Sequence, residues 1–384
     1  MRAARQHASR GWLIGIGLAL AAARAQALDL TGGSAAAQDC PRGAPQLQVD
    51  AAAYLEPAPV LYATRYGGEY YRPAAGNNIG FAVAFGELSA RAGPFCLGLV
   101  AREEWDAHAT RDLLDAVVAN HDGKPFATGR AYRLAYQLQM FQAGGIRVRR
   151  VMTLASSPAG RLQLGIGISA LRATQGRQEW GSGSATATSP QYAVGTATWT
   201  RIDSGTPSGF NPFVGVPHPS AWGYATDIDL RASLRSGTSA DVAIMDPESR
   251  IYWRDIADSK RSFDDATIRY NADINREALL TGVDYRISST QRLPVKYRVA
   301  LDQAIAGSWH LRLSDDAIEG YHFPAAGARY GSEDRFIGTE FDTRTRAVAI
   351  SARWHWLEAA VASNHFPLSG ATALAVSLEI VRPQ

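Results

Sequence analysis

The sequence predicts an all-β fold: an antiparallel transmembrane β-barrel of about 12 strands (roughly 10 to 16) with one short amphipathic helix. Three observations point to it. Side chains alternate between apolar and polar in many short segments, the polar positions carry charges of both signs, and the chain begins with a secretory signal. Successive side chains of a strand point to opposite faces of the sheet, so alternation with a period of two is typical of strands.

The alternation is clearest in five segments between residues 224 and 314. Segments of about ten residues are long enough for tilted strands to cross a bilayer, with apolar side chains toward lipid and polar ones toward the lumen. The predicted lumen-lining side chains are Asp227, Asp229, Arg231, Arg235, Arg269, Asp273, Asp284, Arg286, Lys296, Arg298, Arg312 and Arg353. The alternative is a soluble sandwich or barrel with its charged face in water, which alternation alone does not exclude.

Residues 1–27 are predicted to be a cleaved signal peptide. Arginines precede an apolar run over residues 12–23, and Ala25-Gln26-Ala27 is a small-x-small cleavage site. The run is too short to span a bilayer as a helix. Removing the four arginines of this segment from 39 basic residues leaves 35 against 36 acidic ones, so the net charge changes from +3 to −1. No nucleic-acid partner is therefore expected.

Residues 28–125 are expected to form an N-terminal segment that either plugs the lumen or supplies first strands, before a barrel over residues 126–384. Apolar residues recur at helical spacing over residues 106–120, with Thr110 as a suitable N-cap. This helix could plug the lumen, lie across a barrel end or decorate a loop. The acidic residues 103–106 before it are expected to form a solvated turn, because they lack the spacing of a calcium loop.

Cys40 and Cys96 are the two cysteines of the chain, and both lie in the exported part. In an oxidising compartment such a pair is expected to be bridged. Two thiols so far apart have no supporting ligand spacing for a metal. We therefore predict a Cys40–Cys96 disulfide, no metal site and no cofactor.

From residue 130 the alternation continues to the C-terminus. Hairpin turns are predicted at Gly144-Gly145, at residues 157–160 and at residues 236–238. Long loops are predicted over residues 174–190, 203–220 and 315–332. Asp246-Pro247 indicates either a bulge or the start of a new strand.

This pattern resembles Gram-negative outer-membrane β-barrels of the porin-like class over residues 130–382. The aromatic residues that support the resemblance are Tyr132, Trp199, Tyr224, Trp309, Trp354 and Trp356. The resemblance is to a class, without a match to one family, and implies outer-membrane lipid as the surroundings. Such barrels usually end on an aromatic residue, whereas this chain ends in Arg382-Pro383-Gln384.

No catalytic motif is present: there is no G-x-S-x-G, no H-E-x-x-H and no cysteine nucleophile. The histidines 310, 322, 355 and 365 are scattered, so a non-enzyme is expected, with an outer-membrane hydrolase as the alternative. Three functions remain open. They are a channel for small solutes, an export or assembly barrel working with envelope partner proteins, and a soluble secreted β-protein that binds glycans. The sequence does not indicate the oligomeric state.

Overall fold

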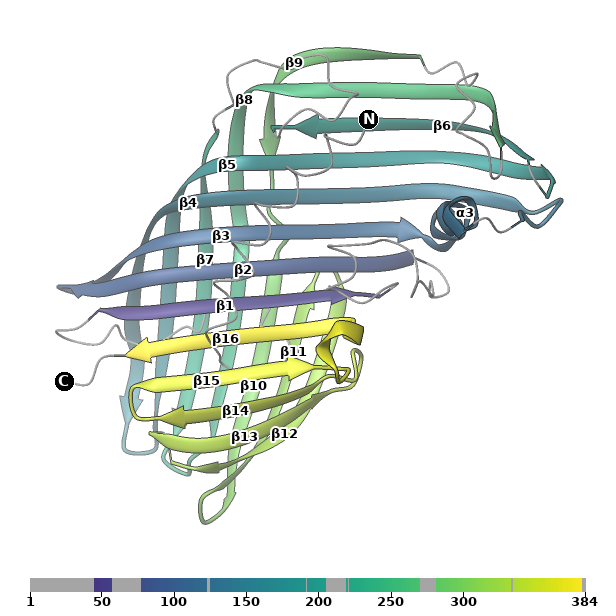
Figure 1. The fold of residues 1–384 in the computed structure, drawn as a ribbon. Helices are drawn as coiled ribbons and strands as arrows, with labels where there is room; N and C mark the ends of the chain where they lie inside the picture. Colours follow the sequence, from purple (N-terminus) through teal and green to yellow (C-terminus); the bar gives the residue numbers. More distant parts are fainter. Residues whose placement is uncertain are drawn as a thin grey trace.

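The computed structural model describes residues 45–56, 77–122, 125–190, 192–204, 219, 221–269, 281–332 and 334–381. Within these residues, sixteen strands form one antiparallel sheet, of which 14 close into a ring (Figure 1). The ring closes because β5 pairs with β7, β8 pairs with β10, and β16 pairs with β1. The predicted all-β barrel with one short helix is confirmed. The estimate of about 12 strands is corrected to 14, because β1, β2 and β3 belong to the ring.

The ring strands are β1 (Gln46–Leu55), β2 (Asn77–Ala92), β3 (Phe95–Thr110), β4 (Ala131–Ser157), β5 (Gly160–Ser189), β7 (Ala221–Leu234), β8 (Ser239–Arg269), β10 (Lys296–Ala306), β11 (Trp309–Ile318), β12 (Tyr321–Gly331), β13 (Arg335–Asp342), β14 (Val348–Trp354), β15 (Leu357–Ser363) and β16 (Ala373–Val381). The strands β6 (Tyr192–Asp203) and β9 (Thr281–Gln291) lie outside the ring. The helices are α3 (Arg111–Asp122) and the short 3-10 helix η1 (Leu368–Gly370).

The two ends of the barrel differ in their connections. At one end, tight turns join β2 to β3, β4 to β5 and β10 to β11, with Gly93 and Gly307 in the left-handed conformation that such turns require. β1 begins and β16 finishes at this end, which we call the short-turn end. The opposite, loop end carries the longer connections, as is usual for barrels of the outer membrane.

Three ring strands continue well past the loop end. β4, β5 and β8 are 27, 30 and 31 residues long. Their outer parts pair with β6 and β9, and we call this five-stranded sheet the outer extension (Figure 1). Two predictions fail here. Most of residues 174–190, expected to be a loop, belong to β5, and Gly144-Gly145 lies inside β4, because pairing with β3 and β5 on both sides keeps the strand continuous.

The outward face of the ring is a continuous apolar surface. Leu99 is 62% exposed and lies opposite Ile146 of the neighbouring strand. The same contact between outward apolar side chains recurs around the ring. Further pairs are Val148–Ile168, Ile166–Ile228, Ile228–Ile244, Val242–Val299, Leu301–Leu313, Phe341–Val348, Ile350–Val361 and Leu47–Leu88. A soluble protein does not expose apolar surface of this extent, whereas lipid covers it without cost.

Exposed aromatic residues mark both rims of this surface. Trp309, Trp354 and Trp356 lie at the short-turn end, and Trp222 and Tyr252 lie toward the loop end. On β10, the nine residue-to-residue steps from Tyr297 to Ala306, which pairs with Trp309, rise about 30 Å along the strand. A tilt of about 40° reduces this to about 23 Å, close to the apolar band of outer-membrane barrels.

Helix α3 lies in the connection between β3 and β4 at the far end of the outer extension (Figure 1). It begins one residue after Thr110, whose hydroxyl oxygen accepts a hydrogen bond from the Leu113 amide at 3.4 Å. The predicted N-cap is thus confirmed, and the helix decorates a loop outside the lumen. Residues 106–110 are strand instead of helix, because they pair with β2 and β4. Among the described residues, neither helix is long and apolar enough to cross a membrane.

Candidate functional site

The candidate site is the lumen of the ring, where charged side chains meet across the barrel. Arg102 and Glu104 point inward from β3, Asp246 from β8 and Lys296 from β10. Lys296 Nζ lies 2.8 Å from Glu104 Oε2 and 3.0 Å from Asp246 Oδ2. Arg102 donates hydrogen bonds to both acids. We call these four residues the central ion network.

The central ion network is closed to water. Lys296 is 0% exposed and Asp246 is 1% exposed. Two positive and two negative groups cancel, so no net charge is buried, and each carboxylate contacts both cations. Taking charges out of water costs several kcal/mol per ion unless the geometry of the partners is good. The network therefore fixes one arrangement of the lumen walls more than it adds stability.

Asp246 reaches the network because β8 is irregular there. Its backbone lies in the left-handed region, with φ 61°, and the pairing with β7 shifts register between Ala225 and Asp227. Three residues of β8, from 246 to 248, stand opposite one residue of β7, and the extra residues of such a bulge re-aim a side chain. Of the two possibilities for Asp246-Pro247, the structure has the bulge, and β8 continues without a break.

A second ion cluster lies next to the central ion network. Arg147 Nη1 is 2.7 Å from Glu87 Oε2, and its Nη2 is 2.8 Å from Asp227 Oδ2. Inward glycines make room for such side chains: a Cβ on Gly98 would lie 2.6 Å from Glu87 Oε1, and one on Gly165 would lie 2.4 Å from Asp229 Oδ1. The alternation of glycine with aliphatic residues in β5 thus reflects a crowded interior.

Further ion pairs line the short-turn half of the lumen. His310 Nδ1 is 2.7 Å from Asp302 Oδ1, and Arg329 Nε is 3.0 Å from Asp302 Oδ2. Arg312 pairs with Glu340 at 3.0 Å, and Arg353 pairs with Glu358. The interior is therefore polar from the central ion network to the short-turn end.

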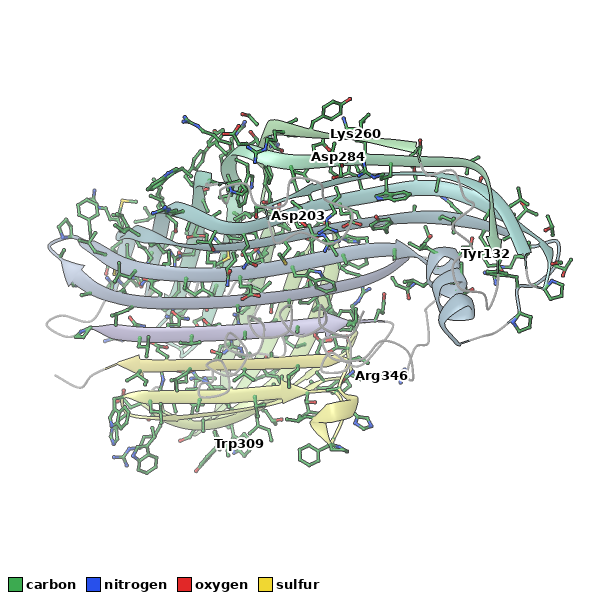
Figure 2. All side chains as sticks on the ribbon, turned by 45° about the horizontal axis from the view of Figure 1, so that its top comes forward. Tyr132, Asp203, Lys260, Asp284, Trp309 and Arg346 are labelled. Carbon is green, nitrogen blue, oxygen red and sulfur yellow. The ribbon has the colours of Figure 1, made fainter. Side chains whose placement is uncertain are left out.

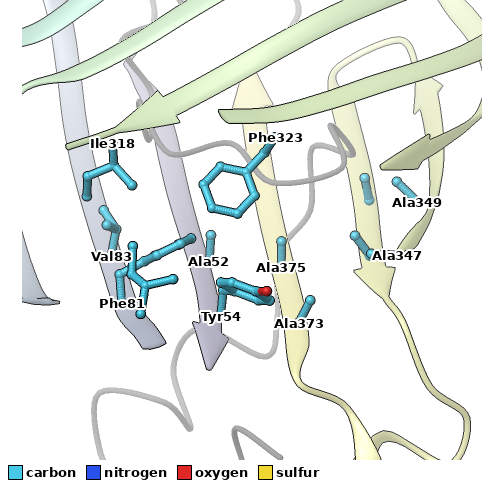
Figure 3. Close-up of a cluster of buried hydrophobic side chains, with 13 residues drawn as sticks. Ala52, Tyr54, Phe81, Val83, Ile318, Phe323, Ala347, Ala349, Ala373 and Ala375 are labelled. Atoms are coloured by element: carbon cyan, nitrogen blue, oxygen red, sulfur yellow. The ribbon is translucent and has the colours of Figure 1, made fainter. Parts of the chain in front are cut away.

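Toward the loop end, aromatic side chains from opposite walls meet across the lumen (Figure 3). The Phe323 ring of β12 lies 5.4 Å from the Phe81 ring of β2 and 5.6 Å from the Tyr54 ring of β1, both in edge contact. We call these three residues the aromatic seal. Small inward residues on β14 and β16, such as Ala349 and Ala375, leave space for these rings.

The aromatic seal depends on a hairpin that the sequence did not predict. β11 and β12 run through residues 315–332, which were expected to be a loop, and Glu319-Gly320 form the turn between them with positive φ at both residues. Arg344 covers the Tyr321 and Phe323 rings at 5.0 and 5.4 Å. Asp315 and Asp316, the first two residues of the expected loop, both lie in β11.

The structure brings together some of the predicted lumen residues. Asp227, Asp229, Lys296 and Arg298 are buried in the interior. Three more are partly buried: Arg231, Arg312 and Arg353. Arg231 pairs with Asp241 at 3.5 Å.

Other predicted lumen residues lie elsewhere. Arg235 lies in the exposed turn between β7 and β8. Asp284 and Arg286 lie on β9, outside the ring, and Asp284 pairs with Arg261 at 2.7 Å in the outer extension (Figure 2). Asp273 and the side chain of Arg269 lie outside the described residues, as do residues 1–27 and Cys40.

Several interior charges were missed in the sequence. Arg102, Glu104 and Asp106, expected to lie in or beside a solvated turn, face the lumen with Glu87 and Arg147. Their signal was present: Arg102, Glu104 and Asp106 alternate with Glu103 and Trp105, and a strand pattern of this kind predicts one shared face.

No protein-family model matches the chain, and no curated protein matches it. Solved structures that align with it include a TodX mutant described as a monoaromatic hydrocarbon channel, which covers 88% of this chain and 89% of its own at 8% identity and a TM-score of 0.43. An outer membrane channel from Pseudomonas putida F1 covers 91% of this chain and 98% of its own at 7% identity and a TM-score of 0.23. A FadL homologue from Pseudomonas aeruginosa covers 87% of both chains at 11% identity and a TM-score of 0.21.

The closed ring, the apolar exterior and the charged interior of the chain itself give it the architecture of a porin-like outer-membrane β-barrel.

Proposed function

We propose that the chain is an outer-membrane channel for small solutes whose lumen is closed in this conformation. The observation that supports the proposal most directly is contact across the lumen at two levels, the central ion network and the aromatic seal. A barrel needs no such contacts for its own closure, because the ring of strands already satisfies the backbone. Contacts that cross the lumen therefore act on what passes through it.

The two levels close the lumen by different chemistry. The aromatic seal excludes water and ions, because an apolar constriction is dry. The central ion network offers charged groups of both signs. When the lumen opens, these groups would exchange their contacts with one another for contacts with a polar solute or with water. Solute passage would thus require the β11–β12 hairpin to move and the ion pairs around Lys296 to rearrange.

We place the protein in the outer membrane after cleavage of the signal peptide following Ala27. The short-turn end would face the periplasm and the outer extension would stand outside the cell, which is the usual orientation of such barrels. Mass spectrometry of membrane-derived protein should find Leu28 at the N-terminus; retention of residues 1–27 would contradict the assignment.

The outer extension favours a second candidate function, work with an envelope partner protein. It stands beyond the ring and carries half-exposed aromatic side chains such as Trp180 and Tyr285. An export barrel would not conduct ions in the absence of its partner protein. Conductance measured on the purified protein alone therefore separates the two functions.

The experiment compares conductance in planar bilayers for the native chain and Phe323→Ala. Removal of the Phe323 side chain takes about 3–5 kcal/mol of packing from the aromatic seal. We expect brief, rare openings of the native chain and a several-fold higher open probability in the variant. Phe366→Ala is the matched control, because Phe366 is 90% exposed in the loop between β15 and β16 and should change nothing. Heat-modifiable gel mobility shows whether Phe323→Ala is folded. If the folded variant conducts no more than the native chain, the proposal is contradicted.

A further inference from the structure

Three side chains with metal-binding atoms converge at the loop end of the lumen. Asp106 and His108 lie two residues apart on β3 and therefore point to the same side. Glu319 reaches them from the turn between β11 and β12, which belongs to the far wall of the ring. His108 Nε2 lies 2.8 Å from Glu319 Oε2 and 3.9 Å from Asp106 Oδ2. The three ligand atoms all lie within 4.8 Å of one another.

The Asp106 carboxylate is the feature that a simple histidine–glutamate ion pair leaves unexplained. Asp106 is 4% exposed, and within the described part of the chain its Oδ2 atom has no hydrogen-bond partner. A buried carboxylate oxygen without a partner is costly. The buried cations of the neighbouring central ion network, Arg102 and Lys296, contact Glu104 and Asp246 instead.

The charge balance favours a bound cation. Two carboxylates face one imidazole, so with both carboxylates ionised the group is negative whether or not His108 carries a proton. A divalent ion would neutralise both carboxylates and supply the partner that Asp106 Oδ2 lacks. An imidazole with two carboxylates suits borderline transition metals, whereas Mg²⁺ and Ca²⁺ prefer all-oxygen sites.

We propose that Asp106, His108 and Glu319 bind a divalent transition-metal ion of the Zn²⁺ type. Ligand bonds of about 2.0–2.2 Å in tetrahedral geometry separate ligand atoms by about 3.4 Å. The distances of 2.8 and 3.9 Å bracket this value, and the remaining pair of ligand atoms, on Asp106 and Glu319, lies within 4.8 Å, so side-chain adjustments would complete the site. Three protein ligands leave one position for water. The sequence predicted no metal site here, because Glu319 is distant in the chain from Asp106 and His108 and lay in an expected loop.

The bound ion would tie the β11–β12 turn to β3. The Tyr321 ring lies 5.5 Å from the His108 ring, and Phe323 of the aromatic seal follows two residues later. Metal binding would therefore hold the aromatic seal shut. This closing role rests on the proposed channel function, whereas the binding itself does not.

The test measures Zn²⁺ binding to the refolded full chain in detergent by isothermal titration calorimetry, with Mg²⁺ as the comparison ion. We expect one Zn²⁺ per chain and no heat from Mg²⁺. His108→Ala should abolish the site, and Glu319→Gln should weaken it at least about tenfold, since even the loss of a supporting residue costs that much. His322→Ala is the matched control, because His322 pairs with Asp315 at 2.7 Å on the exposed side of the same hairpin.

The outcomes separate the two proposals. No stoichiometric Zn²⁺ binding by the native chain, or equal loss in His108→Ala and His322→Ala, overturns the metal site and leaves a plain ion pair. If His108→Ala does not fold, Zn²⁺ binding by Glu319→Gln alone decides whether the metal site exists. Glu319 lies in a turn at the barrel end, where a substitution should leave the fold intact. Zn²⁺ binding without any fall in bilayer conductance would keep the metal site and overturn its closing role.

Discussion

The guanidinium of Arg102 and the carboxylate of Asp246 form a two-bond ion pair across the lumen, with distances of 3.0 Å for Nη1–Oδ1 and 2.6 Å for Nη2–Oδ2. β3 and β8 are not neighbours in the ring, so the pair joins separate walls. Asp246 is the residue of the β8 bulge that makes this reach possible. The lumen is thus closed by a local backbone irregularity combined with a long-range electrostatic contact.

Asp246→Asn should destabilise the barrel by about 3 kcal/mol or more, because Arg102 and Lys296 would keep a buried positive charge without its partner. Urea unfolding in lipid vesicles, followed by gel mobility, measures the change. Asp241→Asn is the control: Asp241 is partly exposed and pairs with Arg231 at 3.5 Å, so its loss should cost below about 1 kcal/mol. Equal effects of the two variants would mean that the central ion network is not structurally important.

Leu301→Arg should cost about 2–4 kcal/mol, because Leu301 faces outward midway between the aromatic rims and its replacement would meet hydrocarbon. His310→Arg introduces the same group on the inner face of the neighbouring strand, where Asp302 can pair with it, and should cost little. The free energies of unfolding in vesicles provide the comparison. A soluble β-protein would also lose stability with Leu301→Arg, so a lipid-borne quencher must reach a fluorophore attached at Leu301→Cys.

The Cys40–Cys96 disulfide remains a prediction, since Cys40 lies outside the described residues. Cys96 lies at the short-turn end, two strands from the start of β1 at Gln46. The six residue-to-residue steps from position 40 to position 46 can span about 20 Å, and Gln46 and Cys96 lie about 12 Å apart by strand spacing and rise. Non-reducing peptide mapping should join the two cysteine peptides, and reduction should cost about 4 kcal/mol in the chain-entropy model. Two alkylatable thiols in the folded protein would rule the bridge out.

Helix α3 should loosen in acid. The pKa of Asp112 is lowered, first by the hydrogen bond from the Arg133 amide at 2.9 Å and then by the Arg130 side chain at 2.6 Å. A lowered pKa means that the stabilisation is complete above the unfolded value of about 3.9 and fades as pH falls below it. A nitroxide at Ala116→Cys should gain mobility in that range. Asp112→Asn should show the gain already at neutral pH, and a mobility that is independent of pH in the native chain would contradict this role.

The alternation of side chains predicted the strands and their two faces without tertiary information. In β10 and β11, Val299, Leu301, Leu311 and Leu313 share the outward apolar face, because the side-chain period of a strand is two. The same rule placed Asp227, Asp229, Lys296 and Arg298 inside. Thr110 marked the start of the helix, because its hydroxyl suits the free amides there.

The tertiary structure decided which charges meet and where strands end. β4 passes through Gly144-Gly145 and β5 through residues 174–189 because paired neighbours satisfy their backbone groups, which local sequence cannot show. Asp284 alternates like a lumen residue, yet β9 pairs outside the ring. Contacts such as Arg102–Asp246, Phe81–Phe323 and His108–Glu319 join segments that are distant in the sequence. They form only when the ring closes and brings opposite walls of the barrel face to face.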